Sequence, residues 1–256
     1  KVPVFLGSSF AFIAPIIAAT KIYGYPGTLG GIIAVGLVYG IVSAIIKLWG
    51  LRVIEKIFPA VVVGPVIMII GLSLATFGVD MAKTNWPIAL SVLATAIIIV
   101  SFTKGLIKLI PIFIGIIVGY IISIIAGLVD FTSVNEAAWF ALPKFTTPEF
   151  NWGAILYMIP VAIAPIIEHI GDMYAIGGVA NKKFVKDPGL HRTLLGDGIA
   201  TAFAGFFGGP PNTTYSEVTG AVTLTKAFNP AIMTWAAICA ILLAFVGKVG
   251  AILQTI

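Results

Sequence analysis

Carboxylates interrupt the apolar stretches of this 256-residue sequence at only a few positions. Glu168 and Asp172 are spaced i and i+4, which places both side chains on one face of a helix. Two close carboxylates shielded from water do not both ionise readily, so we expect at least one of them to hold a proton at neutral pH. Such a pair can take up and release a proton. The alternative is a structural polar patch between packed helices.

His169 directly follows Glu168 and lies about 100° further around the same helix. Its ring could titrate, bind a metal or hydrogen-bond to the backbone. We favour the backbone contact and predict no metal site, because the sequence has only 2 histidines and therefore no cluster that could complete a zinc site. Asp197 opens a glycine-rich segment, and we expect it to cap or brace a helix rather than to contact a substrate.

A third carboxylate, Glu217, follows the Ser/Thr-rich stretch Asn212-Thr213-Thr214-Tyr215. There it could accept hydrogen bonds from N–H groups of a polar substrate, or it could only satisfy orphan backbone donors at a helix start. Phe10 follows a similar stretch, Gly7-Ser8-Ser9. Its ring could stack on a flat molecule, although a plain core phenylalanine is nearly as good an interpretation.

The elements that carry these residues are apolar. Hydrophobic residues make up 59% of the sequence and charged residues 10%, whereas a soluble domain is about 25% charged. A membrane helix needs about 20 apolar residues, and charge-free stretches of that order fill most of the sequence. We therefore predict an all-α polytopic membrane protein. Its nine expected spans are 11–20, 29–46, 58–79, 86–103, 106–128, 154–179, 194–209, 213–225 and 230–247.

The first and eighth of these spans are too short to cross a bilayer as one helix, and each follows a β-prone stretch. We interpret them as broken elements, because non-helical backbone at membrane depth is tolerated only where protein buries it or where it lines a cavity. Residues 8–21 and 213–226 align without gaps, and both end in Thr-Lys. The two elements lie an odd number of spans apart, so they would run in opposite directions, as in an inverted repeat.

Basic residues support this topology because they gather on one predicted side of the membrane. Eleven of the 15 Lys and Arg residues fall there, which makes 180–193 a cytoplasmic loop and 129–152 an external one. We interpret the basic loop as a solvated connector, since no phosphate-binding glycine loop accompanies it. The expected domains are a first core part at 1–50, gate helices at 51–128, the external loop at 129–152 and a second core part at 153–256.

Four motifs resemble those of the nucleobase/ascorbate transporter family, and most closely its uracil-transporting bacterial branch. The motifs are Gly7-Ser8-Ser9-Phe10-Ala11-Phe12, Glu168-His169-Ile170-Gly171-Asp172, Lys186-Asp187-Pro188-Gly189-Leu190-His191-Arg192 and Gly209-Pro210-Pro211-Asn212-Thr213-Thr214-Tyr215. The resemblance implies an inverted-repeat transporter of about fourteen spans with a core and a gate domain, of which this chain is similar to the third to eleventh spans.

The resemblance also implies a substrate and its contacts. The substrate would be a nucleobase, with uracil the first choice and xanthine or urate the alternative. Glu168 and Glu217 would bind its N–H groups, and Phe10 would pack on the ring with Tyr215 nearby. The backbone at Phe10 and Ser216 would meet its carbonyl groups.

Proton coupling would involve Asp172, Glu217 and His169, with the proton as coupling ion and no cofactor. The resemblance places the protein in the inner membrane as a homodimer, with no nucleic-acid partner. Two departures bear on specificity: Asp172 stands where uracil permeases typically have a second histidine, and Val218 stands where the family signature has Asn. An acidic residue at position 172 is similar to the xanthine and urate branch.

Two other classes of protein fit the residues less well. One is an intramembrane enzyme with a metal held by Glu168, His169 and Asp172, and the other is a channel. Because Lys1 stands where an initial Met would be, we also expect the natural start to be missing, so that an inactive fragment of a permease is a separate alternative.

Overall fold

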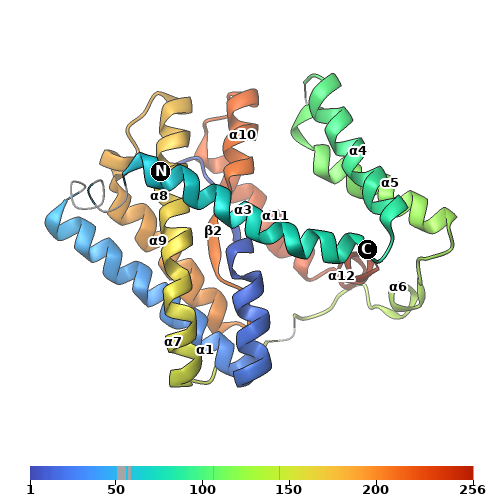
Figure 1. Cartoon of the computed structure of the whole chain (residues 1–256), viewed down its shortest axis with the longest axis horizontal. Helices are drawn as coiled ribbons and strands as arrows, with labels where there is room; N and C mark the ends of the chain where they lie inside the picture. The colour runs from blue at the N-terminus through green and yellow to red at the C-terminus, as the bar shows by residue number, and fades with distance from the viewer. Residues whose placement is uncertain (51–55, 57–58, 106, 144, 256) are drawn as a thin grey trace. The chain divides into compact units, whose positions relative to one another are not determined.

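A computed structural model describes residues 1–50, 56, 59–105, 107–143 and 145–255 (Figure 1). Residues 51–55, 57 and 58, at the start of the predicted gate, lie outside the described residues. The chain divides into two compact units. Unit 1 comprises Lys1–Leu74, Lys144–Thr223 and Ala227–Met233, and unit 2 comprises Ala75–Pro143, Leu224–Lys226 and Thr234–Ile256. All the candidate site residues belong to unit 1, whereas the predicted core and gate domains stay a prediction.

Unit 1 begins with a helix that a glycine breaks. After the 3-10 turn η1 (Phe10–Phe12), α1 extends over Ile13–Trp49, but Gly24 within it has φ 73° and ψ 164°. Glycine adopts this left-handed region at no steric cost, and Pro26 has no N–H to donate to the preceding turn. The break therefore falls between the first two spans that the sequence predicts.

Further helices pack with α1 into a bundle (Figure 1). They are α7 (Trp152–Met158), η3 (Ile159–Ala162), α8 (Ile163–Ala180), the π-turn η4 (Val185–Gly189) and α9 (Leu190–Phe206). Glycines allow α1 and α9 to approach closely: a Cβ added at Gly36 would lie 2.6 Å from the carbonyl oxygen of Gly198, and one at Gly205 would lie 2.9 Å from Ile33. Small residues of this kind are typical of helix contacts in membranes.

The two β-prone stretches pair with each other. β1 (Leu6–Ser8) and β2 (Asn212–Thr214) are antiparallel, with Gly7 opposite Thr213, and α10 (Ser216–Thr225) follows β2. Thr201 of α9 fixes β2, because its Oγ1 accepts a hydrogen bond from the Asn212 N–H at 3.1 Å. The pairing satisfies backbone groups that would otherwise be costly in an apolar environment. The broken elements predicted from the sequence thus meet within one unit.

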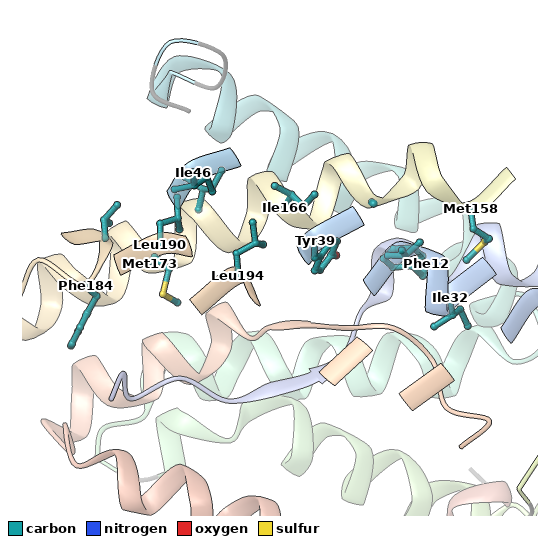
Figure 2. Close-up of a cluster of buried hydrophobic side chains, with 14 of the residues drawn as sticks. Phe12, Ile32, Tyr39, Ile46, Met158, Ile166, Met173, Phe184, Leu190 and Leu194 are labelled. Atoms are coloured by element: carbon teal, nitrogen blue, oxygen red, sulfur yellow. The ribbon is translucent and has the colours of Figure 1, made fainter. Parts of the chain in front are cut away.

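The core of unit 1 is an apolar cluster from α1, η1, α7, α8, α9 and the segment before α9 (Figure 2). Its largest fully buried side chains include Tyr39, Phe12, Met158, Met173 and Leu194. The cluster fixes the position of α8 against α1 and α9. Because α8 carries the predicted carboxylate pair, this packing positions the candidate site.

Among the described residues, the regular elements of unit 2 are helices, and an isolated antiparallel bridge joins Phe140 to Val246. Its helices are the later part of α3 (Ala60–Ala82), α4 (Trp86–Phe102), η2 (Ile107–Leu109), α5 (Pro111–Ile125), α6 (Thr132–Glu136), the later part of α11 (Pro230–Ala244) and α12 (Gly247–Gln254). A Cβ at Gly119 of α5 would lie 2.3 Å from a methyl of Val92 on α4. Lys248 Nζ of α12 donates to the carbonyl oxygens of Val134 at 2.6 Å and Asn135 at 3.0 Å in α6. The sequence predicted neither α6, in the expected external loop, nor α12.

Apolar helices dominate the described part of the chain. Within it, three stretches are long and apolar enough to cross a membrane: Phe10–Trp49, Gly64–Ala82 and Trp152–Ala180. Three shorter apolar helices, α4, α5 and α11, accompany them. Large apolar side chains are exposed on several of these helices, among them Leu72 on α3 and Trp235 on α11. Lipid is the natural environment for such faces, while the count of nine spans stays a prediction.

Candidate substrate and proton site

The predicted carboxylate pair lies on α8 and faces β2. Thr213 Oγ1 donates a hydrogen bond to Glu168 Oε2 at 3.3 Å, and Thr214 Oγ1 donates to Asp172 Oδ2 at 2.7 Å. Asp172 is buried, whereas Glu168 is only half-buried. Both carboxylates therefore accept hydrogen bonds from adjacent residues of one strand. As the i, i+4 spacing predicts, the two side chains lie on one face of α8.

Asp172 has a second partner at the start of α10. Ser216 Oγ donates to Asp172 Oδ1, so each oxygen of the Asp172 carboxylate accepts a hydroxyl hydrogen bond. Glu168, in contrast, accepts one long hydrogen bond from the described side chains. The two carboxylates thus differ in availability: Asp172 is engaged by protein hydroxyls, and Glu168 has an oxygen left to bind another donor.

Aromatic rings gather where β1 and β2 meet. The ring centroids of Phe10 and Tyr215 are 6.4 Å apart, and those of Phe5 and Tyr215 are 6.3 Å apart. Tyr215 Oη donates to the Ser8 carbonyl oxygen at 3.1 Å. A Cβ at Gly7 would lie 2.4 Å from the Tyr215 ring, so the ring needs glycine at this position. Phe10 is 55% exposed, so its interpretation as a plain core phenylalanine is wrong.

Glu217 lies in the first turn of α10 and is exposed. Its charge is close enough to act on both Glu168 and Asp172. A carboxylate at the start of a helix is favoured by the helix dipole. The structure therefore brings three predicted carboxylates together around the junction between β2 and α10, with Ser216 and Tyr215 beside them.

His169 points away from this junction, into the contact between α8 and α9. Its Nε2 is 3.0 Å from Thr193 Oγ1, and its Nδ1 is 3.2 Å from Asp197 Oδ2. The second contact is close enough for an ion pair but is not aligned as a hydrogen bond. The expected backbone partner is thus replaced by side chains. Both residues are almost completely buried, at 1% and 0% exposure.

Asp197 braces two helices and does not cap one. The sequence placed it near the start of a span, but α9 begins at Leu190, two turns earlier, so the capping interpretation is wrong. The buried hydroxyl of Tyr39, close enough to Asp197 to interact with its charge, has no hydrogen-bond partner among the described residues. Sequence reasoning missed Tyr39, because one more aromatic residue in an apolar span carries no signal.

The arrangement provides hydrogen-bond acceptors rather than metal ligands. Within the described residues, no group of three His, Cys, Asp or Glu side chains could hold a metal ion. His169 faces Thr193 and Asp197, so its ring is not directed at the hydroxyl donors that bind Glu168 and Asp172. What the site offers is carboxylate oxygens, hydroxyl groups and exposed aromatic surface, a combination suited to a flat molecule with N–H donors.

The chain has helices long enough to span a membrane, and its carboxylates lie beside a short strand pair. These features are typical of a polytopic membrane protein with a polar centre, as solute transporters have. The chain belongs to the Permease family, whose model matches residues 1–256. This confirms the resemblance to the nucleobase/ascorbate transporter family, and it makes the chain part of an integral membrane transport protein rather than an enzyme.

Similar proteins carry related names. The chain is 56% identical over 265 residues to a "Probable uracil permease" of Haemophilus influenzae, covering 100% of this chain and 64% of that protein. It is 42% identical over 273 residues to the "Uracil permease" of Bacillus caldolyticus and 39% identical over 267 residues to that of Escherichia coli K12, covering 100% of this chain and 63% and 62% of those proteins. The chain therefore spans just under two thirds of the length of these relatives.

A solved structure shows the fold independently of sequence. The transmembrane domain of the cyanobacterial bicarbonate transporter BicA matches with a TM-score of 0.67, covering 96% of this chain and 67% of that chain at 19% identity. At this identity the match concerns the fold alone. It confirms that the chain is a mostly helical protein with the fold of that transmembrane domain.

Proposed function

We propose that the protein takes up a nucleobase, with uracil the first choice, together with protons across the cytoplasmic membrane. One observation carries the proposal: Glu168 and Asp172, on one face of α8, both receive hydroxyl hydrogen bonds from the strand that leads into α10 and Glu217. Relatives named uracil permease, matched over the whole of this chain, support the choice of uracil.

The substrate contacts follow from which groups are available. Glu168 has an unoccupied oxygen and Glu217 is exposed, so both can accept hydrogen bonds from the N–H groups of a base. The exposed ring of Phe10, 6.4 Å from that of Tyr215, can cover the face of the base. The backbone at Phe10 and Ser216 would meet its carbonyl groups.

The proton carrier in this proposal is Asp172. Its two oxygens accept from Thr214 and Ser216, so a proton arriving on the carboxyl can reverse one of these hydrogen bonds by turning a hydroxyl group from donor to acceptor. Hydroxyl groups can make this change by rotation, because each can donate or accept. Ser216 is the first residue of α10, so protonation of Asp172 would change a hydrogen bond at the start of the helix that carries Glu217.

His169 and Asp197 have a supporting part. Their buried contact joins α8 to α9 directly behind Glu168. A buried carboxylate without a partner is costly, so the imidazole of His169 stabilises Asp197 in this contact. His169 would thus contribute to coupling by keeping Glu168 in place, and not by contacting the base.

Alternating access would follow from the inverted repeat, with β1 and β2 as corresponding parts of two oppositely directed elements. We also propose that the loop at 180–193 is cytoplasmic and that the protein is a homodimer, as the family resemblance implies. A purine substrate of the xanthine type is the second candidate, and Asp172 is the residue that favours it.

Transport by the full-length protein in proteoliposomes tests the proposal. Radiolabelled uracil uptake should require an inwardly directed proton gradient and should continue in the presence of excess xanthine. Block by xanthine would move the assignment to the second candidate. Uptake that is independent of the proton gradient and does not saturate would contradict a coupled carrier and favour a channel.

A further inference from the structure

A hollow lies at the end of α8, away from the carboxylates of the candidate site. Its volume is about 510 Å³, and its lining includes Met173, Gly177, Gly178, Lys182, Lys183 and Lys186. The glycines and Met173 belong to α8, and the lysines to the segment between α8 and α9. Glu168, Asp172 and Glu217 do not line it, so it is a separate feature of unit 1.

The rim of the hollow is positively charged. Lys182, Lys183 and Lys186 are exposed, and none of them has a carboxylate within ion-pair distance in the described part of the chain. Ammonium groups that are not already paired can bind a phosphate as point charges, each with several hydrogen-bond donors. The rim therefore favours an anion over a neutral or cationic ligand.

Two of the last carbonyl groups of α8 are occupied by hydrogen bonds, which lessens their repulsion of an anion. Asn181 adopts the left-handed conformation, with φ 52° and ψ 39°, and closes the helix. The Lys182 N–H donates to the Gly177 oxygen at 2.9 Å, and the Asn181 N–H donates to the Gly178 oxygen at 3.4 Å. Because these carbonyls are occupied, the lysine charges dominate the local field.

The floor of the hollow is apolar and has room. Met173 and Val185 are buried apolar side chains beneath the hollow, so its floor brings no polar side chain to a ligand. Gly177 must be glycine, because a Cβ there would lie 2.7 Å from the Lys182 carbonyl oxygen. Gly178 has no such neighbour, and a Cβ at this position would meet nothing within 4 Å. An apolar floor with a basic rim matches a molecule with an anionic head and a hydrocarbon part.

We propose that this hollow binds an anionic phospholipid, with its phosphate among Lys182, Lys183 and Lys186 and its first acyl carbons beside Gly178 and Val185. The basic loop is predicted to lie on the cytoplasmic side, where basic pockets of membrane proteins receive anionic headgroups. The bound lipid ties the segment before α9 to the bilayer surface. This inference is independent of the identity of the transported base.

Native mass spectrometry of the detergent-solubilised full-length protein tests the site. The probe is phosphatidylglycerol, compared with phosphatidylcholine. One variant removes the charge, Lys182→Gln with Lys183→Gln and Lys186→Gln, and a second fills the space, Gly178→Leu. Neutralising a lysine near an anionic lipid costs roughly fivefold in affinity, so the triple variant should weaken binding of the first phosphatidylglycerol on the order of a hundredfold.

Matched controls separate the site from general attraction. Three lysines on the same predicted side, at positions 47, 104 and 108, are changed to Gln, and Gly196→Leu adds a side chain at another open glycine, on α9. Both control variants should bind phosphatidylglycerol like the parent, and Gly178→Leu should weaken it at least tenfold. Equal losses of phosphatidylglycerol binding in the site variants and the control variants would overturn the proposal. Binding of phosphatidylcholine as tight as that of phosphatidylglycerol would also overturn it. Displacement of the lipid by inorganic phosphate alone would also overturn it, because the site would then bind a soluble anion.

Discussion

Replacement of Asp172 by Asn separates proton coupling from substrate binding. The carboxylate makes two hydrogen bonds, from Thr214 at 2.7 Å and from Ser216. An Asn side chain has the same shape, and its oxygen and amide can serve the same two hydroxyl groups, which rotate to accept or donate. A hydrogen bond to a charged group is worth about 1.5–3 kcal/mol and one between neutral groups about 0.5–1.5 kcal/mol, so the two bonds together typically lose about 2–3 kcal/mol.

Much of that loss is offset, because the variant no longer buries a charge at a residue that is 3% exposed. We therefore expect Asp172→Asn to fold with a free energy of unfolding within about 1.5 kcal/mol of the parent. Asp172 is buried and both of its oxygens already accept a hydroxyl hydrogen bond, so uracil affinity should change by less than about fivefold, which corresponds to about 1 kcal/mol. What the variant lacks is the group that releases a proton.

The assay is uracil uptake in proteoliposomes across a series of pH values, with binding measured on the same preparation. A rate limited by one proton changes about tenfold per pH unit, and this dependence should disappear in Asp172→Asn. Asp80→Asn is the control, since Asp80 is exposed and forms only a surface ion pair with Lys83. A variant that keeps the full pH dependence, or that loses binding a hundredfold, would refute the assignment of Asp172 as proton carrier.

Three further predictions concern other parts of the site. Glu168→Gln should lower uracil affinity about 10- to 100-fold by calorimetry, because a charge-assisted hydrogen bond to the base is lost; an unchanged affinity would remove Glu168 from the site. Gly7→Ala should lower stability by about 1–3 kcal/mol in thermal unfolding, because its Cβ would lie 2.4 Å from the neighbouring tyrosine ring. Gly40→Ala, at an open helical position, is its control and should stabilise slightly, and equal effects would contradict the packing argument. His169→Gln should lower the free energy of unfolding by about 3–5 kcal/mol, because it leaves Asp197 unpaired. Adding Asp197→Asn should recover much of this loss. Strictly additive losses in the double variant would show that the two residues do not interact.

The parts of the fold that depend on local chemistry could be predicted from the sequence. The break at Gly24 and the carboxylate face of α8 follow from backbone sterics and helical periodicity. The strand pair could be predicted only in part. Each stretch is β-prone by sequence, but the pairing of β1 with β2 depends on the packing of α1 against α9.

Other features could not be predicted, because their cause is tertiary. α9 begins at Leu190 rather than at position 194, since the preceding segment folds as a turn against α8, and this moved Asp197 from a helix end to a helix interior. The partners of His169 come from a helix more than twenty residues away, which no local pattern reveals. Tyr39 is indistinguishable in sequence from a lipid-facing aromatic residue, although it is completely buried.

The most direct test of the central claim is the proton movement that accompanies the substrate. Proteoliposomes of the full-length protein are loaded with a pH-sensitive dye, and uracil is added outside with no gradient imposed. We predict acidification of the lumen that saturates with uracil concentration and is absent in Glu217→Gln. Saturable uracil entry with no change in internal pH would contradict proton coupling through the carboxylates of this site.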